Sequence, residues 1–337
     1  GEHPILIDKF LEDAIEVDVD LISDGKTSVV GAVMEHIEEA GIHSGDSASV
    51  IPPFSLKKEM IEEIITKTKQ IARELQVVGL MNVQYAIQKS TLYCLEVNPR
   101  ASRTIPFVSK TIGVPLAKLA AQVMTGKTLQ ELGFTEEIIP RHVAVKESVF
   151  PFIKFPGVDI ILSPEMKSTG EVMGIDRDFP RAFYKSQDAA SAHIPTEGKV
   201  FISVKRTDKA KIIPIAKKFH EMGYAIVSTE GTAQALQENG IPSQVVLKIA
   251  EGRPNVADLI RNNEVKLIVN TPSGKGPVLD ESKIRSLAVS FKIPCITTLS
   301  AARAATIGLE AVRQGEGLQV KAIQDYHASD HRLSVMK

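Results

Sequence analysis

Hydrophobic and polar residues alternate between residues 5 and 35 and again between residues 81 and 98, which predicts antiparallel strands. In the first stretch Glu16, Asp18 and Asp20 alternate with apolar residues, so three carboxylates share one face of a strand. Apolar residues at helical spacing then predict a helix over residues 56–75. The first part of the chain is therefore expected to combine an antiparallel sheet with helices, which is an α+β arrangement.

The pattern changes after residue 198, where short apolar runs and amphipathic segments follow one another in strict turn. Strands are predicted over residues 200–204, 225–228, 243–247, 267–270 and 295–298, and helices over residues 209–222, 232–238, 256–262, 281–291 and 301–312. Strict alternation favours a parallel sheet with helices on both faces, a Rossmann-like α/β domain. We expect a first domain over residues 1–187, irregular and strand-rich from residue 127, a linker over 188–198, and the α/β domain over 199–337.

Composition limits the classes of function. The 337 residues carry 40 Lys and Arg against 41 Asp and Glu, a net charge of -1, so no global field attracts nucleic acid or a membrane surface. No apolar run approaches the ~18 residues that span a membrane, and no signal peptide pattern begins the chain. Cys94 and Cys295 lie in apolar runs and are expected to be buried free thiols, which favours a cytoplasmic location. The chain begins without Met in a strand-like run, so we expect it to start within a domain.

A predicted hairpin over residues 81–104 carries a distinctive polar face. That face gathers one acid and three amides: Asn82, Gln84, Glu96 and Asn98. The other face is apolar and consists of Met81, Val83, Tyr85, Ile87, Tyr93, Leu95 and Val97. A three-residue turn at 88–90 would place Asn82 opposite Glu96. Oxygen ligands of this kind suit Mg²⁺ or Mn²⁺ with phosphate oxygens completing the shell. The alternative is a solvated strand face.

Arg100 and Arg103 follow this hairpin directly. Guanidinium groups bind phosphate or carboxylate through paired N–H donors, so the two arginines are suited to an anionic substrate beside a metal. The alternative is that both are ordinary surface arginines.

A second group of candidate residues follows the predicted strands of the α/β domain. Thr229 and Thr232 lie around a glycine where a helix begins, and backbone N–H groups and the helix dipole favour an anion there. Lys248 and Asn270 end the next two strands, and Lys209 begins the first helix. Because ligands bind beyond the carboxyl ends of such strands, these residues indicate a site that binds a phosphorylated small molecule. The alternative is a plain helix cap.

Two sequence motifs resemble those of carbamoyl phosphate synthetase large chains. They are EVNPRASRTIPFVSKTIGVPLAKLA and SPEMKSTGEVMG, and the resemblance extends over essentially the whole chain. It implies the later part of the second ATP-grasp domain, followed by the allosteric domain with a methylglyoxal-synthase-like fold. The implied reaction is the ATP-dependent phosphorylation of carbamate to carbamoyl phosphate, for pyrimidine and arginine biosynthesis.

The resemblance also assigns roles to particular residues. Arg100 and Arg103 would face the carbamate and the transferred phosphoryl group, and Gln84, Glu96 and Asn98 would hold the divalent metals. The positions that match ATP contacts are Lys9, Leu11, Glu16, Gly41, Ile42, His43, Ser44, Gln84 and Glu96. Taken without the resemblance, residues 36–47 have the composition of an ordinary connecting loop. His36 and Ser47 match a potassium site.

Regulatory sites and partners are implied in the same way. Lys209, Thr229, Thr232, Lys248 and Asn270 match positions that bind the effector nucleotides UMP and IMP. Glu38, Asp46, Glu147 and Thr297 match an ornithine site. The implied partners are a small glutamine amidotransferase subunit and the N-terminal part of the large chain, with no nucleic acid or membrane; a higher oligomer stays open.

Two other functions remain open at this point. The chain could serve only as a regulatory nucleotide-binding module, or it could belong to another ATP-grasp ligase such as a biotin carboxylase relative. The effector-type domain argues against the second alternative. We find no Gly-rich phosphate loop in the sequence, so we expect the chain alone to be catalytically incomplete.

Overall fold

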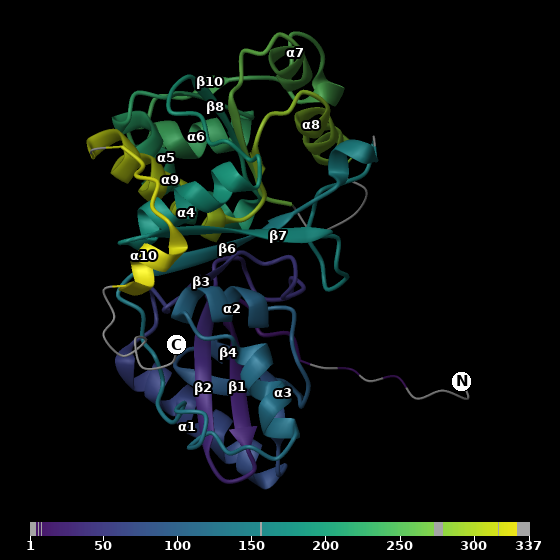
Figure 1. Ribbon diagram of the computed structural model, residues 1–337. Coiled ribbons are helices and arrows are strands. Elements are labelled where there is room, and N and C mark those ends of the chain that lie inside the picture. The colour runs from purple at the N-terminus through teal and green to yellow at the C-terminus, as the bar shows by residue number, and fades with distance from the viewer. Residues whose placement is uncertain are drawn as a thin grey trace. The chain divides into compact units, whose positions relative to one another are not determined.

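The computed structural model describes residues 5, 7, 9–155, 157–272, 279–315 and 317–328 (Figure 1). Contacts within the chain divide it into two compact units. Unit 1 comprises Gly1–Val143 with Val320–Lys337, and unit 2 comprises Ala144–Gln319. The predicted linker at residues 188–198 lies inside unit 2, so the domain boundary that the sequence suggests stays a prediction. No helix in the described part of the chain is both long and apolar enough to cross a membrane.

Unit 1 contains an antiparallel sheet with the strand order β5-β4-β1-β2-β3. Its strands are β1 (Ile15–Asp24), β2 (Ser28–His36), β3 (Ser49–Ile51), β4 (Val78–Gln88) and β5 (Thr91–Asn98). Its helices are α1 (Lys58–Glu74), α2 (Ile105–Ile112), α3 (Leu116–Met124) and α10 (Ile323–Ala328). The long central strands and α1 follow the predicted patterns.

The two faces of this sheet have different characters. One face forms a hydrophobic core with α1, in which Val17, Val19 and Leu21 of β1 pack near Ile64. Strand side chains alternate, so Glu16, Asp18 and Asp20 lie on the other face, as predicted. Helices α2 and α3 pack there, since a Cβ on Gly31 of β2 would meet Leu116 and Val108 at 2.8 and 3.3 Å.

The hairpin between β4 and β5 differs from the predicted register. Its turn contains two residues, Lys89 and Ser90, which both have positive φ angles of 49° and 68°. Two-residue turns of this kind match the twist of the flanking strands. A shift in register between Gln84 and Tyr85 then realigns the far end of the hairpin. Asn82 therefore lies opposite Asn98 rather than opposite Glu96.

Because of the same shift, the apolar face of β5 differs from the predicted one. Leu92 packs against the core, whereas Tyr93 and Leu95 are 39% and 48% exposed. Cys94 is exposed as well, so the prediction of a buried thiol was wrong for this residue. Cys295 is half-buried.

Unit 2 contains a five-stranded parallel sheet with the order β10-β9-β8-β11-β12. Its strands are β8 (Lys199–Ser203), β9 (Ala225–Ser228), β10 (Gln244–Val245), β11 (Leu267–Asn270) and β12 (Cys295–Ile296). The helices between and after them are α5 (Lys209–Glu221), α6 (Glu230–Glu238), α7 (Val256–Arg261), α8 (Leu279–Ser290) and α9 (Leu299–Gln314). The alternation of strands and helices confirms the predicted α/β class.

Helices cover the parallel sheet because their apolar stripes match its faces. Val256 and Ile260 of α7 and Ile284 of α8 pack with Phe201 and Ile268 in one core. In Figure 1, α5, α6 and α9 form a separate group from α7 and α8.

Unit 2 also includes the strands β6 (Val143–Val149) and β7 (Gly170–Asp176), which are neighbours in a sheet. Helix α4 (Phe179–Ala189) follows them and packs on β7 and α9. The sequence predicted only irregular and strand-like structure here, so α4 was missed. Asp178 caps this helix by accepting a hydrogen bond from the backbone N–H of Arg181.

Candidate functional site

The polar end of the β4–β5 hairpin brings the predicted metal ligands together. Gln84 lies opposite Glu96, and the Asn98 side-chain amide donates a 2.6 Å hydrogen bond to Oε1 of Glu96. Gln84 Nε2 donates to Oγ of Ser44 at 3.1 Å. The hairpin is thereby joined to the loop that the resemblance assigns to the nucleotide.

Arg100 extends this cluster beyond the end of β5. Its Nη2 donates to Oδ1 of Asn98 at 3.3 Å, and its backbone N–H donates to the Asn98 carbonyl at 2.8 Å. Both Arg100 and Arg103 are exposed, so their guanidinium groups can reach a ligand in solvent. Arg100 therefore places a positive charge in direct contact with Asn98, one of the three predicted metal ligands.

The donor set fits a hard divalent cation. Gln84, Glu96 and Asn98 offer one carboxylate and two amide oxygens, the ligands that Mg²⁺ accepts together with phosphate and water. The hydrogen bond between Asn98 and Glu96 keeps two of the three side chains in contact. Among the described residues no group of three or more His, Cys, Asp or Glu forms a metal cluster, so this set depends on amides.

The predicted nucleotide loop is held against β1. Glu16 accepts a 3.0 Å hydrogen bond from the backbone N–H of Gly41, whose φ of 94° favours glycine. Within the loop, Nδ1 of His43 accepts from the Gly45 N–H at 3.0 Å. Ile42 is half-buried. Glu16, the loop and Gln84 therefore form one connected group.

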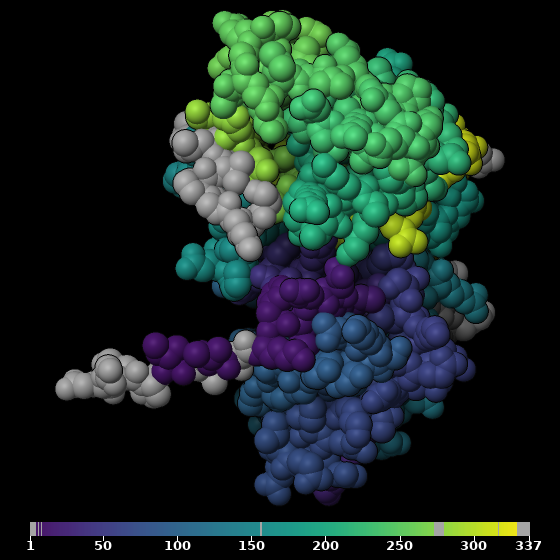
Figure 2. All heavy atoms as spheres, turned by 180° about the vertical axis from the view of Figure 1, so that it is seen from behind, coloured from purple at the N-terminus to yellow at the C-terminus, as the bar shows by residue number. Residues whose placement is uncertain are grey.

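Lys9 and Leu11 flank Phe10, whose ring approaches the loop, since a Cβ on Gly41 would lie 2.9 Å from it. Lys9 is exposed in the N-terminal segment, which Figure 2 shows at the surface in purple, and Ile5 and Ile7 there are 85% and 87% exposed. No hydrogen bond or ion pair described for this segment links Lys9 to the loop or to the hairpin. The ATP contact assigned to Lys9 stays a prediction.

A buried carboxylate that the sequence analysis did not select supports the arginine loop. Oδ1 of Asp20 accepts from Ser102 at 2.7 Å and from Asn82 at 3.0 Å, and Oδ2 accepts from Thr104 at 2.5 Å. Burial raises the pKa of Asp20 to about 6, although these hydrogen bonds oppose the rise. Ser102 and Thr104, the hydroxyl residues on both sides of Arg103, are the sequence feature that could have indicated this role of Asp20.

A second buried cluster lies around His36. Its Nε2 is 3.0 Å from Oδ2 of Asp18, and its Nδ1 is 3.5 Å from Oε2 of Glu16. Burial alone would lower the pKa of His36, but the hydrogen bonds and charges of the two carboxylates outweigh it and raise the pKa to about 9. Ser47 is buried too, and its hydroxyl has no hydrogen-bond partner in the described structure.

In unit 2, several predicted effector residues meet at the carboxyl ends of the central strands. A Cβ placed on Gly231 would lie 2.7 Å from Nζ of Lys209, so this lysine reaches the first turn of α6. Thr229 shares a 3.0 Å hydrogen bond with Ser203, and Thr232 accepts from the Val204 N–H at 3.3 Å. Both threonines are buried, so their hydroxyls help to hold β8 against α6.

Lys248 and Asn270 have different surroundings. Lys248 is exposed, and its ammonium lies 3.2 Å from Oε1 of Glu251. Asn270 is 1% exposed, and its Nδ2 donates to the Ser203 carbonyl at 3.0 Å. Ser203 therefore contacts both Asn270 and Thr229.

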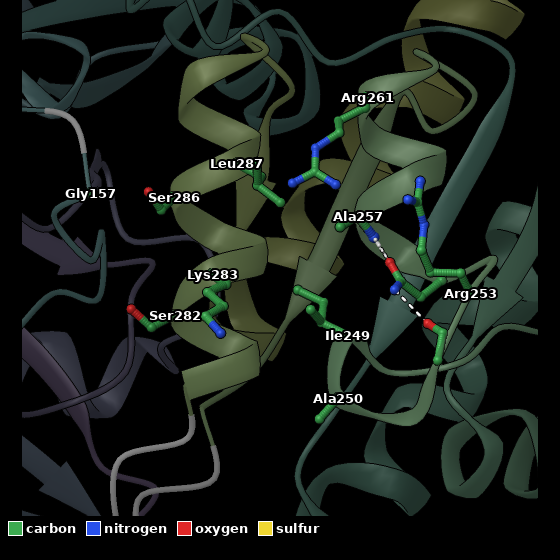
Figure 3. A pocket seen from close by; sticks show the side chains of 12 residues that line it. Gly157, Ile249, Ala250, Arg253, Ala257, Arg261, Ser282, Lys283, Ser286 and Leu287 are labelled. Atoms are coloured by element: carbon green, nitrogen blue, oxygen red, sulfur yellow. Dashed lines mark hydrogen bonds between the residues drawn. The ribbon is translucent and has the colours of Figure 1, made fainter.

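A cavity of about 640 Å³ opens between α7 and α8 (Figure 3). Arg253, Arg261 and Lys283 line it, and Ile249, which directly follows Lys248, also contributes. None of the five predicted effector residues lines this cavity. Arg253 is paired with the carboxylate of Asp258, which offsets part of the positive charge.

The four residues predicted to bind ornithine are divided between the units. Glu38 and Asp46 belong to unit 1, and Glu147 and Thr297 belong to unit 2. Asp46 is buried, with its backbone N–H bonded to the His43 carbonyl at 2.8 Å. This site stays a prediction.

Comparison with known families defines the class of protein. The family model described as "Carbamoyl-phosphate synthase L chain, ATP binding domain" matches residues 1–132, and the model described as "MGS-like domain" matches residues 211–297. The chain thus joins an ATP-binding synthase segment to an MGS-like domain.

Relatives name the family. A carbamoyl phosphate synthase large chain of Methanosarcina barkeri is 52% identical, and the alignment covers 97% of this chain and 82% of that protein. One from Archaeoglobus fulgidus is 56% identical over 97% of this chain and 30% of that protein. The C-terminal section of the enzyme from Methanocaldococcus jannaschii is 53% identical over 97% of this chain and 54% of that protein. The chain belongs to the carbamoyl phosphate synthase large chain family, and it spans 30% of the length of the Archaeoglobus fulgidus relative and 54% of the Methanocaldococcus jannaschii one.

A biotin carboxylase domain of a single-chain bacterial carboxylase aligns over 55% of this chain and 48% of that chain, with 16% identity and a TM-score of 0.45.

Proposed function

We propose that this chain contributes the phosphoryl-transfer site that converts carbamate and ATP into carbamoyl phosphate and ADP. The observation that carries the proposal is the hydrogen bond between Gln84 and Ser44, because it joins the metal-type end of the hairpin to the nucleotide loop. Membership of the synthase family supports the same reaction.

Phosphoryl transfer depends on positioning and on neutralisation of charge. In the proposed site Gln84, Glu96 and Asn98 hold Mg²⁺ or Mn²⁺, which supplies positive charge to the nucleotide phosphates. Arg100 and Arg103 orient the carbamate and bind the negative charge that develops on the transferred group. Glu16 holds the loop from Gly41 to Ser44 around the nucleotide.

The whole reaction belongs to a larger assembly than this chain. Most of the relatives are about three times as long, so we propose that the rest of the large chain completes the ATP site. A small glutamine amidotransferase subunit would supply ammonia. The setting would be pyrimidine and arginine biosynthesis in the cytoplasm.

Replacing Glu96 with Ala in a full-length large chain that carries this segment tests the metal site. We expect metal-dependent ATP formation from ADP and carbamoyl phosphate to fall by about 10²-fold or more, because the only carboxylate of the set is lost. Glu74→Ala is the control, since Glu74 lies at the exposed end of α1. Wild-type turnover by Glu96→Ala would refute the assignment.

The same back reaction should be measured on this chain alone. We expect no ATP formation from a folded sample, because we propose that part of the ATP site lies elsewhere in the large chain. Robust ATP formation would show that this part is dispensable.

We further propose a nucleotide effector site in unit 2, formed by Lys209, Thr229, Thr232, Lys248 and Asn270. Support comes from the approach of Lys209 to the first turn of α6, where backbone N–H groups favour phosphate. UMP and IMP are the expected ligands. Lys248→Ala should weaken UMP binding by about tenfold through loss of one charged contact, and unchanged binding would refute the role of Lys248.

Two further sites rest on family membership alone. We propose that Glu38, Asp46, Glu147 and Thr297 bind ornithine, whose ammonium groups suit carboxylates. We also propose that His36 and Ser47 contribute to a potassium site, Ser47 through its hydroxyl and His36 through its backbone oxygen, because a protonated imidazole has no acceptor for a cation. Titration of the full-length protein with ornithine, before and after Glu147→Ala, tests the first of these.

A further inference from the structure

Arg285 is a buried arginine that none of the proposed sites uses. It lies on α8 and is 2% exposed. Its Nε and Nη2 donate to Oδ1 and Oδ2 of Asp159 at 2.6 and 2.7 Å, which is a two-pronged ion pair. Its Nη1 donates to Oδ1 of Asn270 at 2.8 Å. A fully desolvated guanidinium with three good hydrogen bonds is strongly fixed in orientation.

These contacts determine which way the Asn270 amide faces. A guanidinium has only donors, so the atom of Asn270 that meets Arg285 must be the carbonyl oxygen. The Ser203 carbonyl can only accept, so it must meet the amide nitrogen, at 3.0 Å. Arg285 and Ser203 therefore hold the amide from both sides, and among the described residues its second N–H and its second oxygen lone pair have no partner.

Asp159 fixes the other side of the Arg285 guanidinium. Burial opposes its ionisation, but the hydrogen bonds and charge of Arg285 outweigh burial and hold the pKa of Asp159 below its usual value. Asp159 precedes α4, in a segment that the sequence assigned to the first domain. The chain of contacts thus runs from that segment through Arg285 to Asn270.

We propose that Arg285 is a positioning residue of the effector site, which fixes the Asn270 amide for the nucleotide and is itself fixed by Asp159. The segment around Asp159 is thereby part of the effector site's support, although it contacts no predicted ligand group. The proposal rests on the proposed effector site.

Calorimetric titration of this chain with UMP tests the proposal. Asp159→Asn removes the carboxylate that holds Nε and Nη2 of Arg285 at nearly constant volume and leaves Glu281 at 3.9 Å from Nη1. We expect the Kd for UMP to rise about tenfold. Arg285→Lys should act in the same direction, because an ammonium cannot bind Asp159 and Asn270 in the same fork geometry. The control is Asp258→Asn. Asp258 likewise binds an arginine, Arg253, through both oxygens, but the described contacts of Arg253 do not include Asn270.

A double-mutant cycle separates positioning from general loss of structure. If Asp159 acts through Asn270, then Asp159→Asn should add nothing to the Kd of Asn270→Ala. Full additivity would overturn the proposal. A second measurement needs no ligand: the side-chain amide resonances of Asn270 should move in the NMR spectrum of Asp159→Asn and not in that of Asp258→Asn. Unmoved resonances would also overturn it.

The effector site and the positioning role of Arg285 can be refuted separately. A wild-type chain that binds UMP, together with Asp159→Asn and Arg285→Lys variants of wild-type affinity, would overturn the positioning role and leave the effector site standing. A folded wild-type chain that binds neither UMP nor IMP would overturn the effector site and the role of Arg285 with it.

Discussion

The side-chain amide of Asn82 donates a 3.0 Å hydrogen bond to Oδ1 of Asp20, and both residues are buried in the sheet of unit 1. The same carboxylate accepts hydrogen bonds from Ser102 and Thr104, on the two sides of Arg103. A single buried acid therefore connects β1, β4 and the arginine loop.

Replacement of Asp20 by Ala should lower the free energy of unfolding by about 3 kcal/mol, because three donors lose their acceptor inside the protein. Urea unfolding followed by circular dichroism measures the change. Thr66→Ala is a suitable control, since its hydroxyl bonds only to the Glu62 carbonyl on the exposed face of α1. Equal stabilities of the Asp20→Ala and Thr66→Ala variants would contradict the anchoring role.

His36 should make the stability depend on pH. Its pKa is raised from 6.5 to about 9 in the folded protein, so the folded state binds the proton more tightly than the unfolded chain. The resulting stabilisation is fully present below pH 6.5 and is lost as the pH rises through 9. The shift corresponds to about 3 kcal/mol as an upper value.

Urea unfolding at pH 6, 7.5 and 9 tests this expectation (these values bracket the window between the two pKa values). The difference in stability between the wild-type chain and His36→Gln should shrink across that range, because glutamine does not titrate. A constant difference would show that His36 does not change its charge there.

Gly174 of β7 lies against the backbone of α4. A Cβ at this position would fall far inside contact distance of the Ala182 carbonyl oxygen and the Ser186 N–H. Gly174→Ala should therefore cost more than about 3 kcal/mol or prevent folding of unit 2, since neither backbone can move alone. Gly170→Ala on the same strand meets no atom within 4 Å and should be tolerated. Similar melting temperatures of the two variants would contradict the close approach.

A substitution at Gly231 should affect the stability of the chain and its affinity for UMP differently. Its Cβ would lie 2.7 Å from Nζ of Lys209, which is the flexible end of a side chain and can move away. Gly231→Ala should keep or slightly raise stability, because Ala favours the helix by up to about 1 kcal/mol. It should nevertheless weaken UMP binding by displacing Lys209. Gln234→Ala, on the exposed face of α6, is the control, and equal UMP affinities would argue against a role for Lys209.

Local pattern predicted most elements of the fold. The alternating residues of β1 and β4 and the strict alternation after residue 198 specified the two sheet types, because side-chain periodicity depends on the chain alone. Helix α4 was missed although its sequence carries local helix-start signals, namely Asp178 at the N-cap and Pro180 in the first turn. Register escaped as well, because Lys89 and Ser90 are not the residues that usually adopt positive φ angles.

For the candidate sites, too, some features follow from the sequence and others only from the tertiary structure. The sequence by itself determined which residue types gather at the end of the hairpin and at the strand ends of unit 2, because spacing within an element fixes which side chains share a face. Only the tertiary structure decided that Ser44 meets Gln84, that Asp20 holds the arginine loop, and that Asp159 reaches Arg285. These pairs are separated by 40, 82 and 126 positions, respectively, and no local pattern encodes contacts over such distances. Burial selects them, since a polar group removed from water must find a partner wherever the fold provides one.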